Sequence, residues 1–80
     1  MRVSLNGVLR ASAGGAASID IEAASIQELL AKLEERYPDM AEDLALGIAV
    51  AINGVIYRDD WTQKIPPDAD VVLMPRIEGG

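Results

Sequence analysis

The groups that most often carry out protein chemistry are scarce in this sequence of 80 residues. It has no Cys and no His, so it offers no thiol nucleophile, no disulfide, no Cys/His zinc site and no imidazole base. Asp59 and Asp60 are adjacent, and neighbouring residues of a strand point to opposite faces, so we interpret them as a turn rather than a metal or acid–base site. The remaining candidate is the carboxylate that follows Gly79 and Gly80.

The last five residues, 76–80, can carry this carboxylate to another protein. They follow Pro75, which has no N–H for a strand ladder, and they reach at most roughly 17 Å at about 3.3–3.6 Å per residue. Gly79 and Gly80 lack Cβ and can thread a narrow channel. A carboxylate is unreactive alone but becomes an electrophile as an acyl-adenylate. We therefore predict a globular domain over residues 1–75 and a flexible tail over residues 76–80.

Alternation and helical spacing predict the elements of the first half of this domain. Residues 2–5 and 18–22 alternate polar and apolar side chains on either side of a glycine-containing loop, which predicts a β-hairpin. Ser25 and Glu28 have the spacing of a capping box. Apolar residues then recur at helical spacing until Pro38, so we expect one amphipathic helix there.

Three strands are expected in the second half. Residues 48–52 alternate large and small side chains, which is typical of a strand with one packed face. Asn53-Gly54 is a strong hairpin signal, and residues 55–58 supply the returning strand. Residues 61–70 are interpreted as a connecting loop, and residues 71–74 as the last strand.

The order strand, strand, helix, strand, strand, strand favours a two-layer α+β domain, because one helix covers only one face of one sheet. A ferredoxin-like arrangement would need a second helix before the last strand, where the chain has Pro66-Pro67. We predict a β-grasp, ubiquitin-like fold with a mixed sheet of four to five strands and one main helix on one face. Residues 39–43 stay open between a loop and a turn of helix.

The charge of the chain excludes two classes of partner. Thirteen acidic and seven basic residues give a net charge of −6, which is the wrong sign for binding nucleic acid or anionic lipid. The longest apolar stretch, residues 44–52, is about half the length of a bilayer span, and the first residues lack the pattern of a signal peptide. We expect a cytoplasmic protein.

Several groups of residues occur together along nearly the whole chain. They are Leu9-Arg10 after the first strand, Ile26-x-x-Leu29-Leu30-x-x-Leu33 before Tyr37-Pro38, Ala51-Ile52-Asn53-Gly54, Val71-Val72-Leu73-Met74-Pro75, and the final Gly79-Gly80. In this order, with the β-grasp arrangement, the sequence resembles the small subunit of molybdopterin synthase and its sulfur-carrier relatives, including the thiamine-pathway carrier.

The resemblance implies a chemistry for the tail. A ubiquitin-activating-like adenylyltransferase would use ATP to adenylate the Gly80 carboxylate, and sulfur from a persulfide donor would displace AMP. Gly80 would then end as a thiocarboxylate. In molybdopterin synthase the tail would enter the large catalytic subunit and give its sulfur to the pterin precursor. The small protein itself would bind no cofactor and no metal.

The last strand also offers residues for partner binding. Val72 and Met74 lie on the face opposite Val71 and Leu73, and one of these pairs should be on the uncovered side of the sheet. A docking patch and ordinary core packing both stay open for Val72 and Met74. We predict that they contact the partner together with two tail residues, Arg76 and Ile77. Arg76 would pair with a partner carboxylate, and the alternative for it is a solvated position in the tail.

Alternatives remain for what the tail does. In molybdopterin-type members two prolines and an uncharged residue often precede Gly-Gly, whereas here Arg76 follows Pro75 and Glu78 precedes Gly79. The sulfur could therefore go to thiamine, cysteine or another sulfur-containing metabolite. A ubiquitin-like modifier joined through Gly80 to lysines is a further alternative. So is an interaction module with an inert tail.

Overall fold

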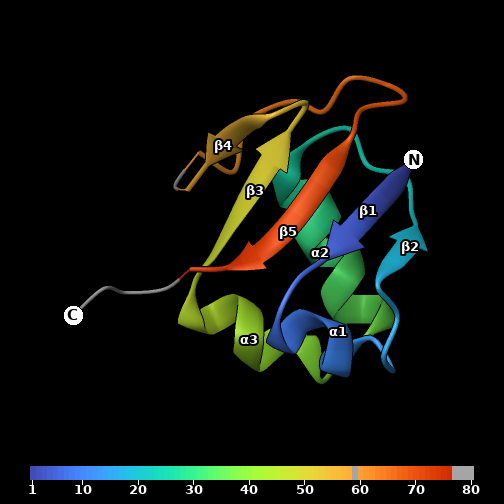
Figure 1. Cartoon of the computed structure of the whole chain (residues 1–80). Coiled ribbons are helices and arrows are strands. Elements are labelled where there is room, and N and C mark those ends of the chain that lie inside the picture. Colours follow the sequence, from blue (N-terminus) through green and yellow to red (C-terminus); the bar gives the residue numbers. More distant parts are fainter. Residues whose placement is uncertain (59, 77–80) are drawn as a thin grey trace.

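The computed structural model describes residues 1–58 and 60–76. Its elements, in chain order, are β1 (Arg2–Leu5), α1 (Val8–Ser12), β2 (Ser18–Asp20), α2 (Ile26–Arg36), α3 (Met40–Leu46), β3 (Ile48–Ile52), β4 (Val55–Tyr57) and β5 (Val71–Pro75). The five strands form one mixed sheet with the order β2-β1-β5-β3-β4. The central strands β1 and β5 are parallel, whereas the other neighbouring pairs are antiparallel. Helix α2 packs on one face of this sheet (Figure 1), so the predicted β-grasp fold is confirmed.

Helix α2 begins where the capping box predicted it. The Ser25 hydroxyl accepts a hydrogen bond from the Glu28 backbone N–H at 3.2 Å, and the Glu28 carboxylate accepts one from the Ala24 N–H at 3.0 Å. Two N–H groups that precede the helical hydrogen-bond ladder are thereby satisfied. The apolar stripe of the helix, which includes Leu29 and Leu33, is fully buried against the sheet.

The core lies between the sheet and the helices. Val71 of β5 pairs with Val3 of β1, and Leu73 of β5 pairs with both Leu5 of β1 and Val50 of β3. Directly paired residues share a face of a sheet, and all five of these side chains are completely buried. Alternation along β5 therefore fixes which of its residues face the helices.

Two short helices add to the predicted elements. The loop expected between β1 and β2 contains α1, whose buried Leu9 and the hydrogen bond from Arg10 Nε to the Leu5 carbonyl at 2.8 Å attach it to the domain. The segment left open after α2 becomes α3. A hydrogen bond from the Ser12 hydroxyl to the Asp43 carboxylate joins α1 and α3.

The β3–β4 hairpin turns at Asn53 and Gly54, which have φ angles of 50° and 86°. Positive φ at both central positions is the geometry that the Asn-Gly pair predicted. The Asn53 backbone N–H donates to the Asp70 carbonyl at 2.8 Å, and the Asn53 side-chain oxygen accepts from the Asp70 N–H at 2.9 Å. These two bonds tie the end of the long loop to the start of β5.

The expected turn before the long loop is described in part. Asp60 accepts a hydrogen bond from the Thr62 backbone N–H at 3.2 Å, which is a local turn contact, while Asp59 lies outside the described residues. Within residues 1–58 and 60–76, no helix is long and apolar enough to cross a membrane.

Candidate functional site

The C-terminal tail starts from a fixed point on the sheet. Strand β5 keeps its pairing as far as Pro75, which lies opposite Ile48, and the Arg76 N–H donates to the Gly47 carbonyl at 3.1 Å. The backbone is therefore held up to Arg76. Ile77, Gly79 and Gly80 lie outside the described residues, so their predicted roles stay predictions, as does the boundary between domain and tail.

Two glycines surround this point, and the sequence analysis did not single them out. Gly7 has a φ of 60°, and a Cβ there would lie 3.0 Å from Cγ of Pro75. Gly47 has a φ of 112°, and a Cβ there would lie 3.7 Å from Cβ and Cδ of Arg76. Both positions need a conformation that L residues rarely adopt. They connect β1 to α1 and α3 to β3, and this placement next to strand ends is the sequence signal that could have revealed them.

Val72 and Met74 lie on the sheet face opposite the core. Val72 pairs with Ser4 on one side and Ala51 on the other, and Met74 pairs with Ala49. Both side chains are half-buried, whereas their neighbours Val71 and Leu73 are completely buried under the helices. The sequence left a docking patch and ordinary core packing open for Val72 and Met74. The structure places both residues outside the core.

The open face of the sheet carries a group of apolar residues that are neighbours in the strand register, which we call the open-face patch. Ala49 and Ala51 are only 6% and 8% exposed, although the helices of the described chain cover the other face. Ile56, which pairs with Ala51, is 51% exposed. The patch consists of Ala49, Ala51, Ile56, Val72 and Met74. An apolar patch of this kind, bordered here by serines, is characteristic of interaction surfaces.

Two exposed apolar side chains lie next to the glycines at the tail base. Leu46, at the end of α3, is 75% exposed, and Val8, at the start of α1, is 57% exposed. Figure 1 shows α1 and α3 at the end of the sheet where β5 ends. The helical periodicity of such short segments is too weak to separate exposed from buried residues, so sequence reasoning missed Leu46 and Val8.

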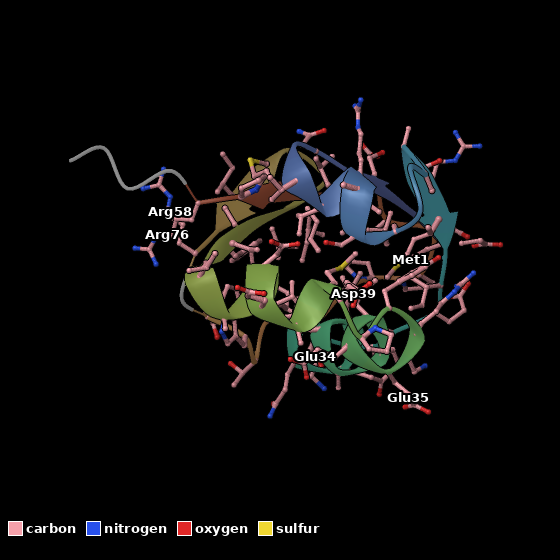
Figure 2. All side chains as sticks on the ribbon, turned by 90° about the horizontal axis from the view of Figure 1, so that it is seen from below. Met1, Glu34, Glu35, Asp39, Arg58 and Arg76 are labelled. Carbon is pink, nitrogen blue, oxygen red and sulfur yellow. The ribbon has the colours of Figure 1, made fainter. Side chains whose placement is uncertain are left out.

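Two arginines and the N-terminal amino group lie at opposite ends of the domain. Figure 2 shows Arg58 and Arg76 together at the end where the tail leaves, with Met1 toward the opposite end. The Met1 ammonium group donates to the carboxylates of Glu22 and Asp20, and these hydrogen bonds raise the pKa of the amino group above its usual value.

A family profile places the chain among known proteins. The profile described as the ThiS family matches residues 3–80, which include the whole fold except the first residue of β1, and both final glycines. The chain belongs to the ThiS family. No protein with a curated description matches the sequence significantly. The resemblance deduced from the sequence motifs is confirmed at the level of the family, and this ThiS-type protein is a ubiquitin-like sulfur carrier.

Solved structures of similar proteins share the fold along nearly the whole chain. A chain of the BexX/CysO complex from Amycolatopsis orientalis is 22% identical, with a TM-score of 0.77, and the match covers 99% of this chain and 98% of that one. Small archaeal modifier protein 1 from Methanosarcina acetivorans is 20% identical, with a TM-score of 0.77 and coverages of 99% and 94%. A Pyrococcus furiosus protein described as a candidate molybdopterin converting factor, subunit 1, is 20% identical, with a TM-score of 0.78 and coverages of 95% and 95%. At these identities the likeness shows a common fold.

Proposed function

We propose that this ThiS-type carrier transfers sulfur as a thiocarboxylate of Gly80, as the small subunit of a molybdopterin synthase. The observation that carries the proposal is the family match through Gly80, on a domain whose last strand is paired as far as Pro75 and hydrogen-bonded at Arg76. A backbone carboxylate presented in this way needs no reactive side chain on the carrier. This agrees with a sequence that has no Cys and no His.

The proposed chemistry has three balanced steps. An adenylyltransferase joins the Gly80 carboxylate to AMP from ATP and releases pyrophosphate. The terminal sulfur of a persulfide donor attacks the acyl carbon, AMP leaves, and an acyl disulfide forms. A second thiol then cleaves the S–S bond, which leaves the thiocarboxylate on Gly80 and a new disulfide between the donor and that thiol. ATP is consumed by the enzyme, so the carrier needs no bound cofactor.

Two parts of the surface serve partner binding in this proposal. The open-face patch lies against the partner, with Val72 and Met74 at its centre, while Arg76 and Ile77 lie at the entrance of the channel that receives the tail. The adenylyltransferase and the large molybdopterin synthase subunit would use this surface in turn. Support comes from the position of Met74, which directly precedes Pro75 at the tail base.

A second acceptor is favoured by the tail sequence. Arg76 and Glu78 place charges where molybdopterin-type members often have prolines and an uncharged residue. A carrier for cysteine, thiamine or another sulfur-containing metabolite is therefore the alternative, and one structural relative is part of a BexX/CysO complex. A ubiquitin-like modifier is the remaining alternative.

Whole-protein mass spectrometry tests the common part of these schemes. The carrier, with Gly80 as its verified last residue, is incubated with ATP, its purified cognate adenylyltransferase and a persulfide donor. We expect a mass increase equal to the exchange of one oxygen for one sulfur, and no change without ATP or in a variant with one Ala added after Gly80. An unchanged mass in the complete reaction would contradict the proposal.

The thiocarboxylated product then separates the acceptors. We expect it to lose sulfur when it is mixed with a molybdopterin synthase large subunit and the pterin precursor, with dithiolene formed in parallel. Sulfur loss only to a thiazole synthase or to a cysteine-forming enzyme would replace the molybdopterin assignment by the alternative. Conjugates to lysine that resist thiol reductants and require Gly80 would instead support the modifier.

A further inference from the structure

Two apolar side chains at the tail end of the domain are strongly exposed to water. Leu46 of α3 is 75% exposed and Val8 of α1 is 57% exposed, which makes them the two most exposed large apolar side chains of residues 1–58 and 60–76. Single exposed apolar residues are common on protein surfaces, but apolar residues that gather at one point often mark an interaction site. We call Val8 and Leu46 the helix-side pair.

Both helices that carry this pair are attached to the tail base. Helix α1 begins there, since a Cβ on Gly7 would lie 3.0 Å from Cγ of Pro75. Helix α3 ends there, since the carbonyl of Gly47 accepts a hydrogen bond from the Arg76 N–H at 3.1 Å. Figure 1 shows the two helices side by side at this end of the sheet. One helix leads away from the tail base and the other leads toward it, so the two run antiparallel.

The hydrogen bond between the two helices shows which of their sides face each other. The Ser12 hydroxyl of α1 donates to the Asp43 carboxylate of α3. Val8 precedes Ser12 by four residues, and Leu46 follows Asp43 by three. Residues at these spacings lie on the same side of a helix. Val8 and Leu46 thus lie on the facing sides of α1 and α3, one turn closer to the tail base.

The tail base therefore has apolar side chains on two sides. Met74 of the open-face patch directly precedes Pro75 and lies on the sheet face opposite the helices. The helix-side pair lies in the helix layer, on the other side of strand β5 (Figure 1). The chain thus leaves the domain between the open-face patch and the helix-side pair.

The length of the tail determines how close a partner must come. The four residues 77–80 extend at most about 14 Å beyond Arg76, at 3.3–3.6 Å per residue. An active site that encloses the Gly80 carboxylate must therefore have its entrance within that distance of the tail base. A channel has walls on every side of the chain that enters it. A partner that contacts the open-face patch alone would cover only one side of the tail base.

We propose that the helix-side pair binds an apolar rim of the adenylyltransferase, on the side of its channel that lies away from the open-face patch; this inference rests on the proposed function. Valine and leucine side chains offer no charge and no hydrogen bond, so the surface that matches them is apolar. Contact on both sides of the tail base holds the carrier in one orientation while the tail is in the channel.

Replacement of the helix-side pair by glutamine, with a matched control, tests the inference. The double variant Val8→Gln, Leu46→Gln removes the apolar surface without changing the net charge of −6. The control Val55→Gln makes the same substitution at a side chain that is 54% exposed. Val55 pairs with Ile52, which also pairs with Val71 at the start of β5, so the control lies at the end of the sheet away from the tail.

The assay is ATP–pyrophosphate exchange by the purified cognate adenylyltransferase, with the carrier concentration varied. We expect the double variant to raise the KM for the carrier about tenfold, and Val55→Gln to raise it less than about twofold. The kcat should stay unchanged, because the pair binds the partner and does not touch the reacting atoms. Urea unfolding of each variant checks that the concentrations refer to folded carrier.

Because the chain has no Cys, a single introduced thiol gives a direct readout of contact. Leu46→Cys and Val55→Cys each carry one thiol, whose labelling by a maleimide is followed by whole-protein mass spectrometry of the carrier. With saturating adenylyltransferase, labelling should slow about tenfold or more at position 46 and change little at position 55, because side chains at the centre of an interface are packed away from water. A role in folding alone would give no protection at either position. The labelling also decides the question if the double glutamine variant fails to fold.

Three results would overturn the inference. The double variant could have the same KM as Val55→Gln, or the adenylyltransferase could leave the labelling of Leu46→Cys unchanged. That labelling could also slow with rising carrier concentration alone, which would indicate contact with a second copy of the chain. Exchange with the unmodified carrier in each of these cases would leave the proposed function intact. Absence of exchange with the unmodified carrier would contradict the proposed function and, with it, this inference.

Discussion

Truncation of the open-face patch should weaken partner binding by an amount that the structure allows us to work out. The double variant Val72→Ala, Met74→Ala removes five non-hydrogen atoms from the patch. At about 0.8 kcal/mol for each buried methylene-sized group, complete burial of these five atoms contributes about 4 kcal/mol of hydrophobic free energy. Both side chains are half-buried in the free protein, so about 2 kcal/mol of this is lost from folding and about 2 kcal/mol from docking. The loss of about 2 kcal/mol from docking corresponds to a roughly 30-fold increase in the KM of the adenylyltransferase for the carrier.

ATP–pyrophosphate exchange by the purified cognate adenylyltransferase, at varied carrier concentration, measures this change in the KM for the carrier. Urea unfolding measures the stability of the carrier. The control is Leu33→Ala, because Leu33 is completely buried under the sheet on the helix side. It should cost about 2–5 kcal/mol of unfolding free energy and leave the KM of the folded carrier unchanged. Our reasoning would be refuted if the double variant kept the KM of the unmodified carrier, or if Leu33→Ala raised KM by a similar factor.

Two further predictions concern the elements that position the tail. Gly47→Ala places a residue with Cβ at a φ of 112°, which should lower the free energy of unfolding by about 1–3 kcal/mol. The thermal midpoint should fall by about 4–8 °C for each kcal/mol. An unchanged midpoint would show that the connection relaxes without strain. Ser25→Ala removes the side-chain acceptor for the Glu28 N–H and should cost about 1 kcal/mol in urea unfolding, whereas Ser18→Ala, at an exposed strand position, should cost less than about 0.5 kcal/mol.

Local signals in the sequence predicted most of the fold because each has its own physical cause. The capping box at Ser25 and Glu28 satisfies N–H groups within a few residues, and Asn53-Gly54 adopts the positive φ angles of its turn without long-range help. The short helices α1 and α3 lack such signals. They are held by tertiary contacts, such as the hydrogen bond between Ser12 and Asp43, which join residues far apart in the sequence.

The candidate site could be predicted from the sequence only in part. Alternation separated Val72 and Met74 from Val71 and Leu73, but which pair faces water depends on where the helices pack. The pairings of β5 with β1 and β3, and complete burial at Val71 and Leu73, decided this. Gly47 was missed because its conformation depends on the approach of β5.

The position of the chemistry determines where specificity must come from. Gly79 and Gly80 have no side chains, so a partner can recognise the end of the tail only by its backbone groups and its carboxylate charge. A choice among adenylyltransferases and sulfur acceptors therefore depends on the domain surface that docks before the tail enters. Strand β5 connects the two requirements, since Leu73 fixes the strand in the core while Val72 and Met74 face outward directly before the tail base. Exchanging the open-face patch between two carriers should consequently move the partner preference with the patch, even when the final glycines stay the same.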